Sequence, residues 1–164
     1  MMNLLSGNLD IRYEEVKRLD FEDIRQYRNK NNVFARRNGI VIEEIREGYA
    51  RVRKTITEDD LNSGGNAHGA ILFAIADTAC GSVAASTGHR AATLNASYNF
   101  LRAGHLGDTL IAQARVRSSE KVIGSYEVEI TNQDGKLIGT ASMNFYIFQK
   151  MIELKENECC EGKS

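Results

Sequence analysis

The chain has 164 residues, 42% of them hydrophobic and 26% charged, so it can form the core of one folded domain and is not a disordered chain. Its 21 Lys and Arg nearly balance its 22 Asp and Glu, which argues against a general nucleic-acid binder, because such proteins normally carry a basic excess. The longest apolar run, residues 70–76, is too short for a membrane span, so we expect no membrane partner.

Residues 1–38 form a polar, charge-rich N-terminal extension. Within it the apolar side chains of Phe21, Ile24 and Tyr27 follow helical spacing, and Asp20 is placed to cap the helix. We predict one short amphipathic helix, which ends before an Asn-Gly turn signal.

Six later segments alternate polar and apolar side chains, and each predicts a strand with one buried face: residues 40–45, 50–56, 93–100, 109–116, 122–130 and 137–147. Between the second and third of them, residues 67–86 are apolar on nearly every side, which predicts a buried helix. The pattern predicts an α+β fold, a long antiparallel sheet wrapped around one buried helix, at residues 39–149. Residues 150–164 are charged and lack a period, so we expect a frayed tail.

Asp77 is the only residue charged at neutral pH between His68 and His89, inside the predicted buried helix. A lone buried carboxylate costs free energy unless it is hydrogen-bonded. Two interpretations stay open from the spacing: a structural aspartate bonded to backbone or to a neighbour such as Thr78, and a functional carboxylate.

Gly69 lies at the predicted start of the same helix, after a glycine-rich loop. The first N–H groups of a helix have no partner within it, and they can stabilise a developing oxyanion. Gly69 and Asp77 are separated by about 12 Å along the axis, at about 1.5 Å per residue. An aspartate side chain is too short for this gap, so the two residues can act on one carbonyl only if they come from different chains. This spacing predicts a two-fold dimer with antiparallel central helices.

Four segments carry a resemblance to a known family: residues 62–70 (NSGGNAHGA), 72–79 (LFAIADTA), 98–104 (YNFLRAG) and 107–110 (GDTL). They are similar to the hotdog-fold acyl-CoA thioesterases, and most of all to the phenylacetate-degradation (PaaI-like) subfamily. The resemblance extends over about residues 40–148 and implies that the predicted sheet and helix form a hotdog fold.

The resemblance also implies roles for individual residues. Asp77 matches the catalytic carboxylate, as nucleophile or as general base for water, and Gly69 matches the backbone N–H that polarises the thioester carbonyl. Asn62 matches a loop asparagine near the reaction centre, and His68 matches a histidine credited with positioning. Ser97 matches a Thr or Ser that lines the site and orients the water.

By the same resemblance, we expect hydrolysis of an aryl-acetyl or medium-chain acyl-CoA, with coenzyme A as part of the substrate and no other cofactor. The resemblance further implies a homodimer with active sites at its interface, and pairing of dimers into tetramers. Among the cations, Arg102, Arg117 and Lys121 are candidates to meet the phosphates of coenzyme A, although each also fits a solvated strand end. The chain departs from the family pattern at Ala70, usually Gly, and at Ala103, usually Pro.

Two alternatives remain. The first is a non-catalytic acyl-CoA sensor joined to an N-terminal DNA-binding segment. A helix-turn-helix DNA-binding segment needs two helices, however, and residues 1–38 predict only one. A hydratase or dehydratase is the other, and it needs a histidine paired with an acid. His68 and Asp77 are about 13 Å apart along the helix axis, so a dimer would have to bring them together.

The remaining candidates point to no further site. Cys80 is predicted to be a small core residue, and the adjacent Cys159 and Cys160 suit a reducing compartment, so we expect a cytoplasmic protein. His89 and His105 fall in predicted loops, and no spacing supports a metal site.

Overall fold

The computed structural model describes residues 20–154. Its strands form one antiparallel sheet in the order β1-β2-β4-β5-β6-β3. The strands are β1 (Val41–Arg46), β2 (Tyr49–Thr55), β3 (His89–Phe100), β4 (Thr109–Ser119), β5 (Ile123–Thr131) and β6 (Leu137–Met151). The helices are α1 (Phe21–Asn31), α2 (Val33–Arg37), the short η1 (Glu58–Asp60) and α3 (Gly69–Ala85).

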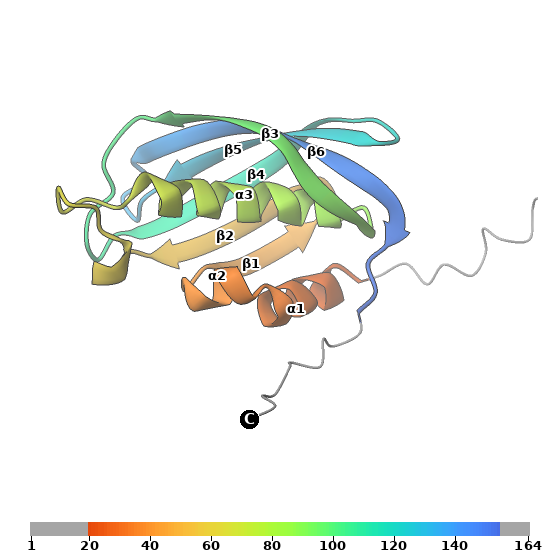
Figure 1. Cartoon of the computed structure of the whole chain (residues 1–164), viewed down its shortest axis with the longest axis horizontal. Helices are drawn as coiled ribbons and strands as arrows, with labels where there is room; N and C mark the ends of the chain where they lie inside the picture. Colours follow the sequence, from red (N-terminus) through yellow and green to blue (C-terminus); the bar gives the residue numbers. More distant parts are fainter. Residues whose placement is uncertain (1–19, 155–164) are drawn as a thin grey trace, which may run out of the picture.

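Helix α3 lies in the concave face of the sheet, which curls around it (Figure 1). Twelve of its residues are buried, and because many of these are Ala, Gly or Ser, the surrounding strands can pack closely against it. The predicted α+β arrangement of a long antiparallel sheet wrapped around one buried helix is confirmed.

The predicted alternation matches the burial along most strands. On β4, Leu110, Ala112 and Ala114 are fully buried and face α3, while the residues between them face outward. Two side chains predicted to face the core are instead exposed at the β4–β5 hairpin, Val116 and Val122. Strand β6 also continues to Met151, slightly beyond the predicted end of the domain.

The N-terminal extension holds two helices rather than the single predicted one, because Asn32 ends α1 and its side chain also accepts a hydrogen bond from the Ala35 N–H at the start of α2. Asp20 caps α1, as predicted, by accepting from the Glu22 N–H. The predicted extension also includes residues 1–19, which lie outside the described residues. Neither helix can span a membrane, and no helix within residues 20–154 is long and apolar enough to do so.

The two edges of the sheet differ. Helix α1 packs along the edge at β1, where the Asn29 amide donates to the Ile42 carbonyl and accepts from the Ile42 N–H. The other edge, β3, has no neighbouring element on its outer side among the described residues. Its apolar side chains Leu94 and Phe100 are 53% and 58% exposed, so the prediction that they face a buried core is wrong for this chain alone.

Candidate functional site

The carboxylate of Asp77 is held by a threonine on the edge strand. Asp77 lies in the middle of α3, where it is partly exposed, and the Thr93 hydroxyl of β3 donates to its Oδ1 at 2.7 Å. Thr78, the neighbour suggested from the sequence, is buried and its carbonyl instead accepts from the Ser82 hydroxyl. The second carboxylate oxygen of Asp77 makes no hydrogen bond within residues 20–154, and Asp77 lines a pocket beside the helix.

A β-bulge decides which residues of β3 face Asp77. The register against β6 shifts between Thr93 and Asn95, so Thr93 pairs with the buried Phe145 on the helix side. Beyond the bulge the alternation is reversed, and Ser97 pairs with the exposed Ser142 on the outer face of the sheet. Thr93, which was not among the predicted site residues, is therefore the hydroxyl residue of β3 that contacts Asp77, and Ser97 does not face it.

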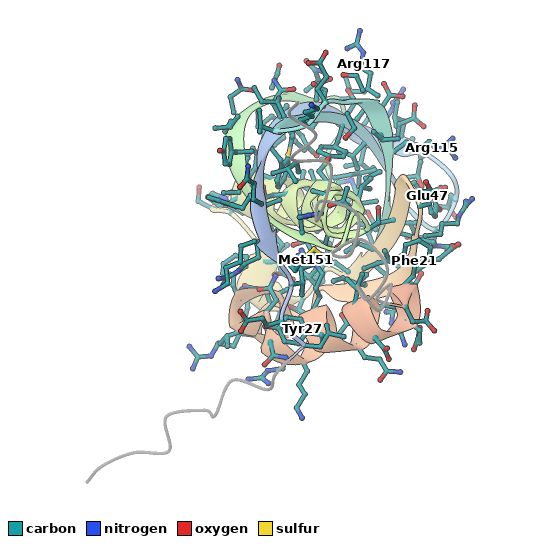
Figure 2. All side chains as sticks on the ribbon, turned by 90° about the vertical axis from the view of Figure 1, so that its right-hand side faces the viewer. Phe21, Tyr27, Glu47, Arg115, Arg117 and Met151 are labelled. Atoms are coloured by element: carbon teal, nitrogen blue, oxygen red, sulfur yellow. The ribbon has the colours of Figure 1, made fainter. Side chains whose placement is uncertain are left out.

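A pocket of about 380 Å³ lies beside Asp77, between α3, α1 and the ends of β3 and β6. Figure 2 looks at this end of the molecule, with Tyr27 on α1 and Met151 at the end of β6, both of which line the pocket. Arg28 of α1 also lines it. Arg28 follows Ile24 by four residues, so the two side chains lie on the same face of the helix. A cation on this otherwise apolar face is unusual, and this signal could have identified Arg28 as a candidate from the sequence.

The start of α3 forms a second part of the site. His68 caps the helix, since its Nδ1 accepts from the Ala70 N–H at 3.0 Å. The Gly69 N–H has no hydrogen-bond partner within residues 20–154. The ring of Phe100 covers Gly69 closely, because a Cβ added there would lie 3.2 Å from the ring. This helix start therefore offers one free donor in a mostly apolar setting.

The loop before α3 is held in a fixed shape. Its Asn62 side chain accepts from the N–H groups of Gly64 and Asn66, at 2.8 and 3.2 Å. A buried ion pair of 2.5 Å between Lys54 and Asp60 anchors the start of the loop. The Asp60 carbonyl in turn accepts from the His68 N–H at 2.7 Å, which ties the ion pair directly to the start of α3.

Burial raises the pKa of Asp60, but the hydrogen bonds from Lys54 and Thr57 outweigh it, and the pKa of Asp60 is lowered overall. The carboxylate is therefore ionised at neutral pH, as the buried Lys54 ammonium requires.

Gly69 and Asp77 do not meet within one chain. Helix α3 is continuous from Gly69 to Ala85, so the two residues are separated by about 12 Å of helix axis, as predicted from their spacing. Asp77 opens on the pocket beside α1, whereas Gly69 lies under Phe100 at the other end of β3.

The three cations predicted to contact the phosphates of coenzyme A do not lie close together within one chain. Arg102 follows β3 and donates to the Leu137 carbonyl, near the start of α3. Arg117 and Lys121 lie at the β4–β5 hairpin, at the opposite end of the sheet, and Arg117 is at the top of Figure 2.

The cysteine and histidine candidates add no chemistry of their own. Burial and, to a smaller extent, the charge of Asp77 raise the pKa of the Cys80 thiol to about 12, so Cys80 is a core residue and not a nucleophile. His89 is the first residue of β3 and not part of a loop as predicted, and its ring contacts the Thr87 carbonyl. His105 is exposed in a loop. Within residues 20–154, no group of three His, Cys, Asp or Glu residues is arranged to hold a metal.

Known proteins resemble this chain both in sequence and in fold. The thioesterase superfamily matches residues 64–138. The acyl-coenzyme A thioesterase PaaI of Escherichia coli is 40% identical over 109 residues, which are 66% of this chain and 78% of PaaI. A solved structure of E. coli PaaI superposes with a TM-score of 0.76 and 34% identity, over 80% of this chain and 98% of that one.

A hypothetical thioesterase protein from Streptococcus pneumoniae, solved with coenzyme A, has a TM-score of 0.66 and 32% identity, over 69% of this chain and 91% of that one. Structures of that protein also exist with alanine in place of an aspartate and in place of a threonine sixteen positions later. Asp77 and Thr93 are likewise sixteen residues apart. The sequence, the fold and these relatives agree, and the chain belongs to the thioesterase superfamily, with the hotdog fold and a PaaI-like sequence.

Proposed function

We propose that the chain is an acyl-CoA thioesterase that hydrolyses aryl-acetyl or medium-chain acyl-CoA to the free acid and coenzyme A. The observation that carries the proposal is the Asp77 carboxylate, hydrogen-bonded to Thr93 and open to a pocket of acyl-group size. The relationship to PaaI, a coenzyme A thioesterase, supports the same activity.

The complete site requires a second copy of the chain. The bare β3 edge is twelve residues long and carries exposed apolar side chains, and such an edge is normally covered in soluble proteins. Pairing of β3 with its symmetry mate extends the sheet across a two-fold axis and sets the two α3 helices antiparallel. Gly69 of one protomer then approaches Asp77 of its partner, which supplies the two groups that one thioester needs. We propose this homodimer as the functional unit, with further pairing of dimers into tetramers.

Hydrolysis then proceeds at the composite site. The thioester carbonyl oxygen accepts from the free Gly69 N–H, which stabilises the negative charge that develops on that oxygen. In the general-base route, Asp77 takes a proton from water as the water attacks the carbonyl carbon. In the covalent route, Asp77 attacks the carbon itself and water cleaves the resulting anhydride. In both routes the tetrahedral intermediate collapses by breaking the carbon–sulfur bond, and coenzyme A leaves as the thiolate and takes up a proton.

The neighbouring residues support this chemistry. Thr93 orients the Asp77 carboxylate, and His68 holds the first turn of α3 so that the Gly69 N–H is directed outward. Asn62 orders the loop that leads to this turn, and its amide nitrogen is available to the thioester or to water. Arg102, Arg117 and Lys121 are proposed to meet the phosphates of coenzyme A, in combinations that only the assembled dimer or tetramer can supply.

A thiol-release assay over a panel of acyl-CoA substrates tests the proposal, with Asp77→Asn as the diagnostic variant and the exposed Asp134→Asn as the matched control. We expect the wild type and Asp134→Asn to release free thiol, and Asp77→Asn to remain folded and lose at least a hundredfold in kcat. Near-normal turnover by Asp77→Asn would contradict the catalytic role. Binding of acyl-CoA by the wild type without thiol release would favour the sensor alternative.

A further inference from the structure

The pocket beside Asp77 is lined by Arg28, a half-buried cation that the chemistry described so far does not use. Arg28 extends from α1 into this pocket, where its guanidinium lies against Gly81, a position of α3 without a side chain. A Cβ added to Gly81 would lie 3.3 Å from Nη2 of Arg28, so the glycine provides the space for the guanidinium.

One nitrogen of the Arg28 guanidinium lacks the hydrogen-bond partner that its burial calls for. Its Nε is buried and has no hydrogen-bond partner, and Arg28 forms no ion pair within the described residues. Arg25, one turn earlier on the same helix, makes hydrogen bonds to Glu22 and to the Ile42 carbonyl. A buried N–H without an acceptor is costly and calls for an explanation, and an anion bound in the pocket is one.

The other charges around the pocket leave this position open to an anion. Lys150 and Glu153 pair with each other at 3.3 Å on the exposed rim, and Arg90 adds a further exposed cation. Asp77 is the other charged group in the interior of the pocket, and its Oδ1 is engaged by Thr93. Burial lowers the pKa of Arg28 and attraction to Asp77 raises it, and arginine remains charged at neutral pH in either case.

We propose that Arg28, in the space left by Gly81, binds a carboxylate at the far end of the acyl group, so that the preferred substrates are medium-length ω-carboxyacyl-CoA thioesters. The inference rests on the proposed function, because it takes Asp77 as the position of the thioester. Guanidinium and carboxylate groups match in charge and in bidentate geometry, which makes the interaction selective for that end group.

The helix sets the length of the preferred acyl chain. Gly81 follows Asp77 by four residues, which is about 6 Å along the axis and on the same face. An extended chain advances roughly 1.2 Å per bond, since three backbone bonds span about 3.5 Å. About five bonds therefore connect a carbonyl at Asp77 with a carboxylate at Arg28, which corresponds to the six-carbon adipyl group.

The experiment compares kcat/KM for adipyl-CoA and for hexanoyl-CoA, which has the same length but no terminal carboxylate. The wild type is expected to prefer adipyl-CoA by at least about tenfold, the effect of one charged hydrogen-bonded pair. Arg28→Met is expected to reduce the ratio of the two kcat/KM values by a similar factor. The control Arg25→Met removes the same charge from α1 outside the pocket and is expected to keep the wild-type ratio.

The other possible results separate a failure of this inference from a failure of the proposed function. A wild type without preference for adipyl-CoA overturns the inference, and this comparison decides it even when Arg28→Met does not fold. An equal loss for both substrates in Arg28→Met also overturns it, because Arg28 would then act through Asp77. Turnover of hexanoyl-CoA alone leaves the thioesterase function intact while the inference fails. Absence of thiol release from every acyl-CoA contradicts the proposed function itself.

Discussion

The free N–H of Gly69 can be removed with very little other change. Gly69 is the first residue of α3, where proline is accepted because that N–H has no partner within the helix. His68 has φ −64° and ψ 138°, the extended conformation that a residue before proline adopts. Gly69→Pro therefore deletes the donor, while His68 still caps the Ala70 N–H.

Gly69→Ala is the matched control, because it keeps the N–H and adds the same Cβ. That Cβ would lie 3.2 Å from the ring of Phe100, a contact that a shift of a few tenths of an ångström relieves. We expect Gly69→Ala to lose less than about threefold in kcat. Loss of one oxyanion donor costs about 100-fold to 1,000-fold, so Gly69→Pro is expected to fall below Gly69→Ala by that factor.

The assay is thiol release at saturating acyl-CoA, with thermal unfolding of both variants measured alongside. Similar unfolding midpoints show that the two proteins are equally folded, so that the difference in kcat reports the donor alone. If Gly69→Pro turns over within tenfold of Gly69→Ala, the Gly69 N–H is not the oxyanion donor and the reasoning from the helix start is refuted.

Three further predictions concern the support of the site. Thr93→Val removes the hydroxyl that holds Asp77 and is expected to lower kcat about tenfold with little change in KM. Thr93→Ser keeps a hydroxyl and should retain activity, so equal kinetics of the two variants would contradict this role of the hydroxyl. The pKa of Asp60 is lowered in the folded state, so its contribution to stability is complete above about pH 4 and is lost as the pH falls below that value. Asp60→Asn is thus expected to destabilise the protein at pH 7 by about 3 kcal/mol, because it leaves Lys54 buried without its partner, and to differ less from the wild type near pH 3; urea unfolding at both pH values measures this. Gly139→Ala would place a Cβ against the Tyr98 ring and 3.0 Å from the Asn99 carbonyl, and we expect a loss of about 1–3 kcal/mol in the same measurement.

The sheet and the buried helix could be predicted because their signals are local. A buried face requires apolar residues, so burial can be recognised from the order of residue types along one segment. This is why β4 alternates in polarity and α3 is apolar on nearly every side. The helical spacing of Gly69 and Asp77 likewise follows from chain geometry alone.

The details around Asp77 depend on contacts between distant segments. The bulge in β3 lies within an unbroken alternating pattern, so nothing local shows that Thr93 turns toward the helix and Ser97 away from it. Leu94 and Phe100 carry the pattern of a buried strand face, yet they lie on an edge that one chain cannot cover. Arg28 reaches the pocket only because α1 packs along β1 and Gly81 leaves space on α3.

The central claim, that each active site combines two chains, is tested most directly by a mixed dimer. Asp77→Asn and Gly69→Pro chains are expressed together with different affinity tags, and the heterodimer is purified by selecting for both tags. In a composite site, Asp77 of the second chain meets Gly69 of the first, so one of the two sites is intact and the heterodimer should show about half of the wild-type kcat. A heterodimer no more active than the two inactive homodimers would contradict the account.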